Sequence, residues 1–367
     1  MSPTRRGTRA QQSREDTVDA NLSQQVHLVG SIGLDTVEDV FRDAGKRLGK
    51  YLRRIPDGEP GGRRLWISWQ YPLLRSNPFL RPDPSGAKRP TTGFPLLCLG
   101  EGVSPSELRF GELGYAREAR ASYLDFCVAR ERGELPRHLK FQVRLPTPMG
   151  VAYSFCTRRD LGAIEPAYEQ AMLREAEAVC RHIPHRDLCV QWDFCNEMVL
   201  IDGQPQEQFP TIKASTADIM ERMQRLCAPI PETVELGIHL CYGDFGAKHF
   251  IEPIDASRMV EAANGLARSI KRRLDYIHMP VPMSRTDDAF FSPLRELALA
   301  PETEVYLGVV ARDGAEATQR RIAAASRYVP KFGIATECGM ARARTPDLVL
   351  RLLDIHAEVA HDRTPTA

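Results

Sequence analysis

Short apolar runs alternate with amphipathic segments along most of this chain, and no other feature limits its possible folds as strongly. A chain that alternates in this way forms parallel strands joined by crossover helices. We expect strands at 26–31, 52–55, 95–99, 141–145, 188–193, 234–241, 274–279, 305–310 and 333–336. We expect helices at 35–52, 114–133, 165–181, 216–227, 255–271, 287–299, 315–328 and 345–359.

The number of these units predicts one α/β domain, a closed (β/α)8 TIM barrel. We place the barrel at residues 25–367, with one of the two early strands, 52–55 or 95–99, outside it. Residues 1–24 contain almost no large apolar side chain and are predicted to be a disordered tail. A doubly wound open sheet is the alternative architecture, although no G-x-G-x-x-G fingerprint follows the first strand.

The composition argues against several classes of partner. A hydrophobic content of 43% is normal for a chain with a sizeable core. The 49 basic and 48 acidic residues give a net charge of +1, so neither nucleic acid nor an anionic membrane is favoured. The sequence has no long apolar run and no apolar signal segment near its beginning, which predicts a cytoplasmic protein. Its nine scattered cysteines indicate reduced thiols rather than a disulfide framework.

The expected strand 234–241 ends in two metal-ligating side chains. Residues two apart on a strand point to the same face, so His239 and Cys241 are expected to project together. Nitrogen and sulfur donors suit zinc, and a catalytic zinc commonly has three protein ligands and one open position. Cys338 follows the last expected strand and could supply the third donor. The alternative for each cysteine is an inert thiol in the core.

Polar residues gather where the expected strands end, which is where a barrel carries its active site. Such groups are costly to bury at one rim unless they bind each other, a ligand or a metal. Plainer alternatives exist: Asp193 could cap a helix, Glu59 could be solvated, and His278 could be a hydrogen-bonded core histidine. Cys195 lies near Asp193 without an evident partner and is predicted to be structural. The strand-end residues are Gly30, Ser31, Asp57, Glu59, Pro146, Thr147, Pro148, Asp193, Asn196, Glu197, His239, Cys241, His278 and Cys338.

In this order, these motifs resemble the C-terminal catalytic barrel of cobalamin-independent methionine synthase, within the superfamily that also holds uroporphyrinogen decarboxylase. The resemblance covers roughly residues 26–360. No counterpart of the N-terminal barrel of the long synthases is seen, which predicts a short, core-type relative. The matching segments are 29–31 (VGS), 57–60 (DGEP), 153–155 (YSF), 191–193 (QWD) with Glu197, 239–242 (HLCY) and 338–339 (CG).

The resemblance implies a set of substrate-binding residues. Ser31 belongs to the element whose backbone helps to hold the carboxylate of an amino acid in the family. Glu59 and Asp193 would bind the ammonium group of the same substrate. Tyr153 stands where the family stacks an aromatic ring on the pterin of a folate.

The resemblance also implies a zinc centre with His239, Cys241 and Cys338 as ligands. In the family a glutamate supplies a fourth ligand from the strand that here covers residues 276–280, and no carboxylate lies there. His278 could supply a nitrogen instead, or the position could be open to water.

The sequence therefore predicts a zinc-dependent transferase that moves a methyl or other alkyl group to a zinc-bound thiol of a small amino-acid-like substrate. The expected donor is a methyl-folate or methylcobalamin-type compound. Two departures leave the donor open: Phe194 replaces a glutamate of the family beside Asp193, and Tyr153 replaces its tryptophan. The alternative is a metal-assisted lyase or decarboxylase acting on a small amino- or carboxylate-bearing molecule. A third possibility is a binding protein without catalysis.

Overall fold

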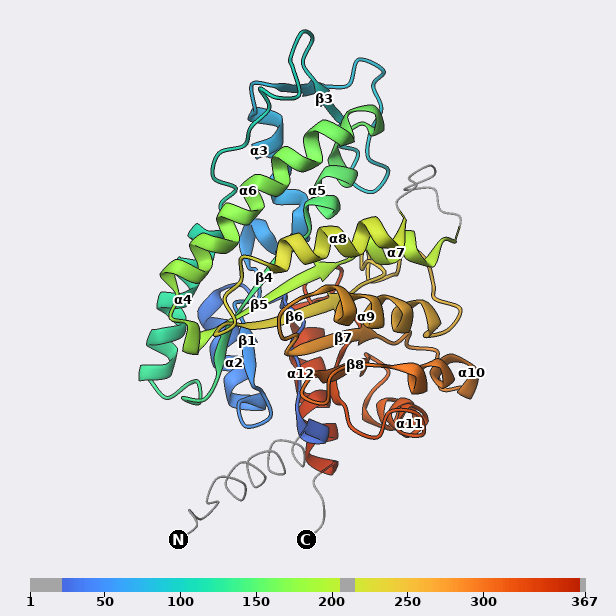
Figure 1. The fold of residues 1–367 in the computed structure, drawn as a ribbon. Coiled ribbons are helices and arrows are strands. Elements are labelled where there is room, and N and C mark those ends of the chain that lie inside the picture. Colours follow the sequence, from blue (N-terminus) through green and yellow to red (C-terminus); the bar gives the residue numbers. More distant parts are fainter. Residues whose placement is uncertain (1–21, 205–214, 364–367) are drawn as a thin grey trace, which may run out of the picture.

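A curled parallel β-sheet forms the centre of the molecule, with helices on its outer face (Figure 1). The computed structural model describes residues 22–204 and 215–363. The strands of this sheet lie in the order β1-β4-β5-β6-β7-β8-β9, and each neighbouring pair is parallel. Their bounds are β1 (Arg54–Pro56), β4 (Lys140–Pro146), β5 (Leu188–Phe194), β6 (Glu235–Leu240), β7 (Tyr276–Pro280), β8 (Glu304–Val310) and β9 (Gly333–Thr336).

Helices connect most successive strands, as the alternation in the sequence predicts. In α2, for example, Val40, Phe41 and Leu48 form a buried apolar stripe, while Thr36 caps the amino end. The α-helices are α2 (Val37–Leu48), α3 (Tyr71–Ser76), α4 (Tyr115–Glu131), α5 (Pro148–Phe155), α6 (Leu161–His182), α7 (Asn196–Asp202), α8 (Thr216–Cys227), α9 (Ser257–Ser269), α10 (Asp288–Phe291), α11 (Ala315–Ser326) and α12 (Pro346–Asp362).

The segment 26–31, expected to be the first barrel strand, forms bridges rather than a regular strand. Val26 makes one parallel bridge with Leu52, just before β1, and another with Ile334 in β9. The segment therefore touches both edges of the seven-stranded sheet. The structure shows a barrel-like α/β fold with seven paired strands, and the complete eight-stranded barrel stays a prediction.

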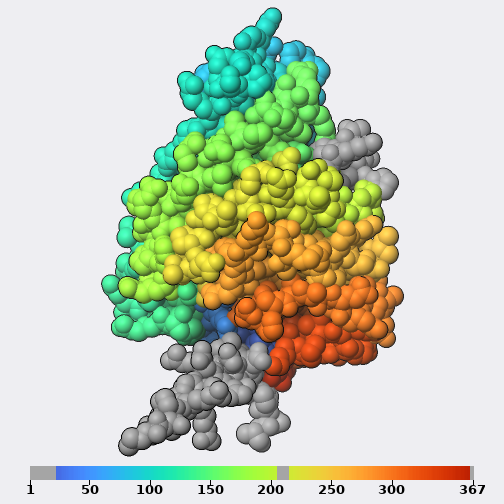
Figure 2. Space-filling view, viewed as in Figure 1, coloured from blue at the N-terminus to red at the C-terminus, as the bar shows by residue number. Residues whose placement is uncertain are grey.

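Of the two early strands, one belongs to the main sheet and the other lies outside it, as expected. β1 pairs with β4 and confirms the strand predicted at 52–55. The strand predicted at 95–99 is β3 (Leu97–Leu99), which pairs antiparallel with β2 (Leu80–Pro82) in a small separate sheet. The hairpin belongs to a projection above α5 and α6, seen in Figure 1 and as the blue and teal tip in Figure 2.

Three helical segments differ from the prediction. The helix expected at 287–299 is one turn of α10 followed by the 3-10 helix Ser292–Glu296, because Pro293 removes a backbone donor. α5 and α7 follow β4 and β5 directly, where we expected loops. α5 begins at a threonine cap, in which Thr147 Oγ1 accepts from the backbone N–H of Gly150.

The sheet encloses a paired polar network towards the amino ends of its strands. Tyr276 donates to Gln191 Oε1 over 3.0 Å, and Arg54 lies over the Tyr276 ring while pairing with Glu304 at 2.9 Å. Gly237 in β6 leaves the space that the Tyr276 ring fills, since a Cβ there would lie 1.9 Å from Cζ of that ring. The charged and hydroxyl groups of this network are thus paired with each other, and the carboxyl ends of the strands are where a barrel of this kind binds its ligand.

Other sequence predictions concern the cysteines, the membrane and the tail. All nine cysteines are free, as their scattered positions predict. In the part of the chain that the structure describes, no helix is long and apolar enough to cross a membrane. Residues 1–21 of the predicted tail lie outside the described residues, and Leu22–Gln24 form a 3-10 turn.

Candidate metal centre

Three donor side chains from distant parts of the chain meet at the carboxyl end of the sheet. His239 lies near the end of β6, Cys241 follows that strand, and Cys338 follows β9. One ligand atom from each lies within 4.8 Å of the others, and all three residues are buried. The two sulfur atoms are 3.6 Å apart. The convergence predicted from the H-x-C motif is therefore present in the structure.

The turn after β6 shapes the sulfur side of this cluster. Gly243 has a φ of +87° and donates its backbone N–H to Cys241 Sγ over 3.3 Å. A side chain at this glycine would collide with the ring of Phe250, which packs against the cysteines. An N–H directed at sulfur favours the thiolate, which is the form that binds a metal.

A chain of hydrogen bonds fixes the protonation of His239. The Thr336 carbonyl lies 3.0 Å from His278 Nε2 and can only accept, so this nitrogen carries a proton. Burial lowers the pKa of His278 to about 3, so its other nitrogen, Nδ1, is a bare acceptor. His239 Nδ1 lies 2.7 Å from that acceptor and must donate to it. The Nε2 of His239 is therefore unprotonated, and it has no hydrogen-bond partner although it is buried.

These donors fit zinc. Zinc binds thiolates at about 2.3 Å with tetrahedral angles, which places two sulfur ligands about 3.8 Å apart, close to the 3.6 Å between Cys241 and Cys338. The neighbouring thiol of Cys195 raises the pKa of Cys241, and Cys241 in turn raises the pKa of Cys338. Two thiols held this close and buried need a cation before both can ionise. A bare imidazole nitrogen without a partner completes a donor set of the kind zinc prefers.

His278 was considered as a fourth metal donor, and the structure places it behind His239. Its two ring nitrogens face His239 and the Thr336 carbonyl. It is not part of the group whose ligand atoms lie within 4.8 Å of one another. In this position it orients the ligating imidazole, as partners of metal-bound histidines commonly do.

Two residues that no sequence motif singles out lie against the candidate metal donors. Cys195, which we expected to be structural, packs in one cluster with Cys241 and Cys338. Trp66 covers the same cluster and donates its indole N–H to Asp193 over 3.0 Å. The backbone of Trp66 has φ +56° and ψ −112°, a strained conformation of the kind that persists at functional sites. Neither residue stands in a recognisable motif, so only the fold could reveal them.

The two carboxylates predicted to bind a substrate ammonium are bridged by an arginine of the protein itself. Arg144 of β4 pairs with Glu59 at 2.5 Å and with Asp193 at 3.0 Å. Burial alone would lower the pKa of Arg144, but the charges of Asp193 and Glu59 raise it above its ordinary value. Burial raises the pKa of both carboxyl groups, because one guanidinium does not fully compensate two buried acids.

The remaining predicted substrate residues lie at different distances from the donor cluster. Ser31 is buried beside Gly339, with its hydroxyl oxygen 2.2 Å from where a Cβ of that glycine would stand, and this hydroxyl has no partner. Tyr153 in α5 does not line the cavity that contains the donors. Burial and the charge of Glu165 raise the pKa of the Tyr153 hydroxyl. The structure thus brings Ser31 near Cys338 and leaves Tyr153 apart from it.

A narrow cavity of about 30 Å³ contains the donor cluster. Its cationic side chains are Arg89, Arg144 and Arg342. Arg342 donates to Cys338 Sγ and to Asp244 Oδ2, each over 3.5 Å. Arg89 is buried over the ring of Phe155, and this burial lowers its pKa to about 10.

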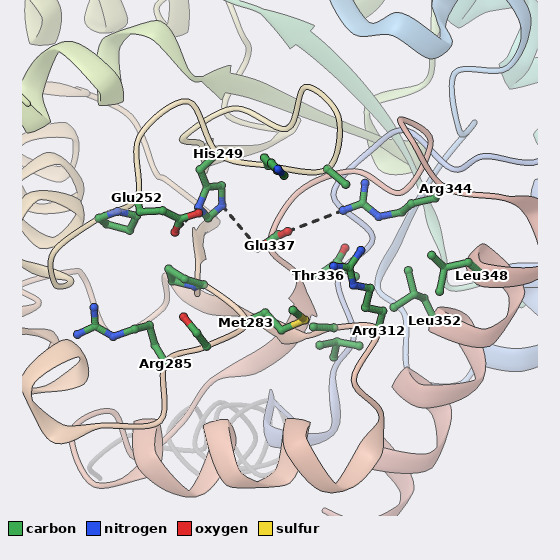
Figure 3. Close-up of a pocket in the computed structure, with 17 residues that line it drawn as sticks. His249, Glu252, Met283, Arg285, Arg312, Thr336, Glu337, Arg344, Leu348 and Leu352 are labelled. Atoms are coloured by element: carbon green, nitrogen blue, oxygen red, sulfur yellow. Dashed lines mark hydrogen bonds and ion pairs between the residues drawn. The ribbon is translucent and has the colours of Figure 1, made fainter. Parts of the chain in front are cut away.

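A larger cavity of about 440 Å³ lies at the carboxyl ends of β7, β8 and β9 (Figure 3). His249 and Arg344 point toward Glu337 from two sides, with distances of 3.5 Å and 3.8 Å to its carboxylate. Glu337 directly precedes Cys338 in the chain. Among the described residues, the two cavities have no lining residue in common, and these consecutive residues line one cavity each.

Solved structures with a similar fold include two proteins related by name to the predicted family. A vitamin-B12 independent methionine synthase from Shewanella, solved with selenomethionine, aligns with a TM-score of 0.58 at 15% identity over 92% of this chain and 98% of its own. A candidate vitamin-B12 independent methionine synthase from Listeria monocytogenes aligns with a TM-score of 0.54 at 12% identity over the same shares. The likeness is one of fold. No protein family and no curated protein matches the sequence.

This likeness supports the predicted class of fold. The chain has the α/β fold of methionine synthase-like proteins, with a barrel-like parallel sheet. Identities this low do not carry over substrate or activity. What the chain does therefore has to be argued from its own residues.

Proposed function

We propose that this chain is a zinc-dependent transferase that moves a methyl or other alkyl group to the sulfur of a small thiol. The observation that carries the proposal is the buried meeting of one imidazole nitrogen and two thiol sulfurs, with ligand atoms within 4.8 Å of one another. His239, Cys241 and Cys338 would hold the zinc. When bound, zinc would hold the substrate sulfur as a thiolate at neutral pH, since coordination to the metal stabilises the anion.

The residues around the donors prepare this site for a thiol. His278 keeps the Nε2 of His239 free of a proton, and the N–H of Gly243 favours the charged form of Cys241. Trp66 and Phe250 pack over the sulfurs and limit the access of water. A dry environment of this kind strengthens electrostatic contacts to a reacting sulfur.

In the reaction, the substrate sulfur attacks the alkyl carbon of the donor. A sulfur–carbon bond forms, the bond from that carbon to the donor breaks, and the donor leaves with the electron pair. The thiol proton passes to solvent. We assign the donor, a methyl-folate or methylcobalamin-type compound, to the larger cavity, because Glu337 in its wall directly precedes Cys338 in the chain.

Metal analysis of the purified full chain tests the proposal first. We expect about one zinc ion per chain in the wild type and much less in Cys241→Ala and Cys338→Ala, because each variant removes a ligand. Cys227→Ala is the matched control, since Cys227 is equally buried but lies in α8 away from the cluster. A wild type without stoichiometric zinc contradicts the proposal.

Product analysis tests the chemistry. Small thiols are incubated with methyl-folate or methylcobalamin donors and the products are identified by mass spectrometry. An S-methylated thiol supports the transferase. Release of carbon dioxide or an olefin from a candidate substrate favours the lyase or decarboxylase instead, and full activity in His239→Ala excludes a metal at these residues.

A further inference from the structure

The pocket that would receive the ammonium group of an amino acid is already filled. The guanidinium of Arg144 lies between Glu59 and Asp193 and forms ion pairs with both. Its side chain is only 3% exposed, as is that of Asp193. A substrate ammonium placed between the same carboxylates would compete with a fixed cation and be repelled by it.

Gly30, near the beginning of the described chain, leaves the space that this arginine occupies. A Cβ at Gly30 would lie 2.5 Å from Arg144 Cδ and 2.6 Å from its Nη1. Only a residue without a side chain leaves room for Arg144 to cross here. Gly30 belongs to the Gly-Ser element expected to help hold an amino-acid carboxylate, so Arg144 also occupies space beside that element.

Two other arginines of the same cavity carry positive charge that carboxylates match only in part, for Arg342, or not at all, for Arg89. Arg342 shares Asp244 with Arg344, which lies closer to it at 2.9 Å. The Nη1 atom of Arg342 is buried and has no hydrogen-bond partner. Among residues 22–204 and 215–363, Arg89 has no ion pair or side-chain hydrogen bond and only stacks on Phe155. One buried guanidinium without an ion pair and another that shares its single carboxylate favour the binding of an anion at this cavity.

We propose that the acceptor thiol carries an anionic group, such as a carboxylate, and no α-ammonium, and that Arg89 and Arg342 bind that anion. Both arginines line the cavity that contains His239, Cys241 and Cys338, so one small molecule can reach the metal donors with its sulfur and the arginines with its acidic end. This inference rests on the proposed function and specifies the substrate class of the same site.

A set of short thiols that differ in charge tests the inference. The zinc-loaded full chain is titrated by calorimetry with 3-mercaptopropionate, 2-mercaptoethanol, cysteamine and L-homocysteine. The cobalt-substituted protein is titrated in parallel, because its absorption spectrum reports binding of sulfur to the metal. We expect 3-mercaptopropionate to bind about tenfold or more tightly than the neutral thiol, and cysteamine and homocysteine to bind most weakly.

Variants assign the effect to the named arginines. Arg89→Met keeps the length of the side chain and leaves no partner unpaired, and Arg342→Met leaves Asp244 paired with Arg344. Arg89→Met is expected to reduce the binding of 3-mercaptopropionate about tenfold and to leave that of 2-mercaptoethanol unchanged. Arg342→Met is expected to reduce the binding of 3-mercaptopropionate more than that of 2-mercaptoethanol, because it also removes an N–H from Cys338 Sγ. Arg320→Met on the exposed face of α11 is the control. Arg144→Met, if it folds, should raise the affinity for homocysteine relative to 3-mercaptopropionate.

The outcomes separate this inference from the function on which it rests. Tighter binding of homocysteine or cysteamine than of 3-mercaptopropionate overturns the anionic thiol and leaves the zinc transferase intact. Equal losses for the charged and neutral thiols in Arg89→Met also overturn it. If no thiol alters the cobalt spectrum, both proposals fail.

Discussion

At the scale of single residues, the candidate site depends on how one histidine is held by another. His239 can offer a bare Nε2 only because its Nδ1 donates to His278, whose own proton is fixed by the Thr336 carbonyl. The sequence presented His278 as a possible ligand or as an ordinary core histidine. The structure places it where it orients a ligand.

Replacement of His278 tests whether its hydrogen bond to His239 supports zinc binding. His278→Leu removes the acceptor for His239 Nδ1 and should lower zinc affinity about tenfold to a hundredfold, while His278→Gln keeps a carbonyl acceptor and should retain more of it. Competition with a chromophoric chelator measures the affinity. Unchanged zinc binding in His278→Leu argues against a role for this hydrogen bond. A loss in His278→Gln as large as in His278→Leu indicates direct ligation instead.

At the scale of elements, strands β6 and β7 place the donors through close packing inside the sheet. The register pairs His239 with His278 and Gly237 with Tyr276. The Tyr276 ring fills the space above the glycine and reaches Gln191. The polar network inside the sheet thus helps to fix the strand that carries His239.

Gly237→Ala should disturb this packing. The added methyl group would lie within 1.9 Å of the buried Tyr276 ring, and such overpacking costs about 1–3 kcal/mol of unfolding free energy. Gly162→Ala in α6 is the matched control, because nothing lies within 4 Å of its added Cβ. Urea unfolding of both variants checks the prediction. Equal stability of the two proteins contradicts the packing argument.

At the scale of the whole molecule, stability should depend on a buried carboxyl group away from the metal donors. Burial raises the pKa of Glu197 in α7 from its ordinary value of 4.5 to about 7, and its Oε2 has no hydrogen-bond partner. Because the folded state holds this proton more tightly than the unfolded state, the stabilising contribution is complete below pH 4.5. It is lost as the pH rises through 7.

Glu197→Gln should remove this dependence. The amide stays neutral at every pH, so the variant is expected to keep roughly 3 kcal/mol that the wild type loses between pH 4.5 and pH 8. Urea unfolding of both proteins across that range measures the difference. Parallel stability curves for the two proteins would falsify the assignment to Glu197.

The alternation of apolar runs and amphipathic segments determined the class of fold. It located the strands of the main sheet and most helices to within a few residues, because period and capping are properties of neighbouring residues. It could not foresee that 26–31 would make only bridges or that Pro293 would shorten α10, since these outcomes depend on pairing and packing. The H-x-C motif of His239 and Cys241 was visible because the two donors lie two residues apart at the carboxyl end of one strand.

The tertiary structure alone decided what surrounds the donors. Arg144 stands in an ordinary strand, and nothing near it in the sequence shows that it pairs with Glu59 across 85 residues. Trp66 and Cys195 likewise reach the site through the folding of separate loops. Sequence periodicity reports which face of an element is buried, whereas the charge of a pocket depends on which distant side chains fold against one another. For this protein, sequence periodicity and motifs predicted the class of fold and the candidate metal donors, and the tertiary structure revealed the arginines that line the pocket.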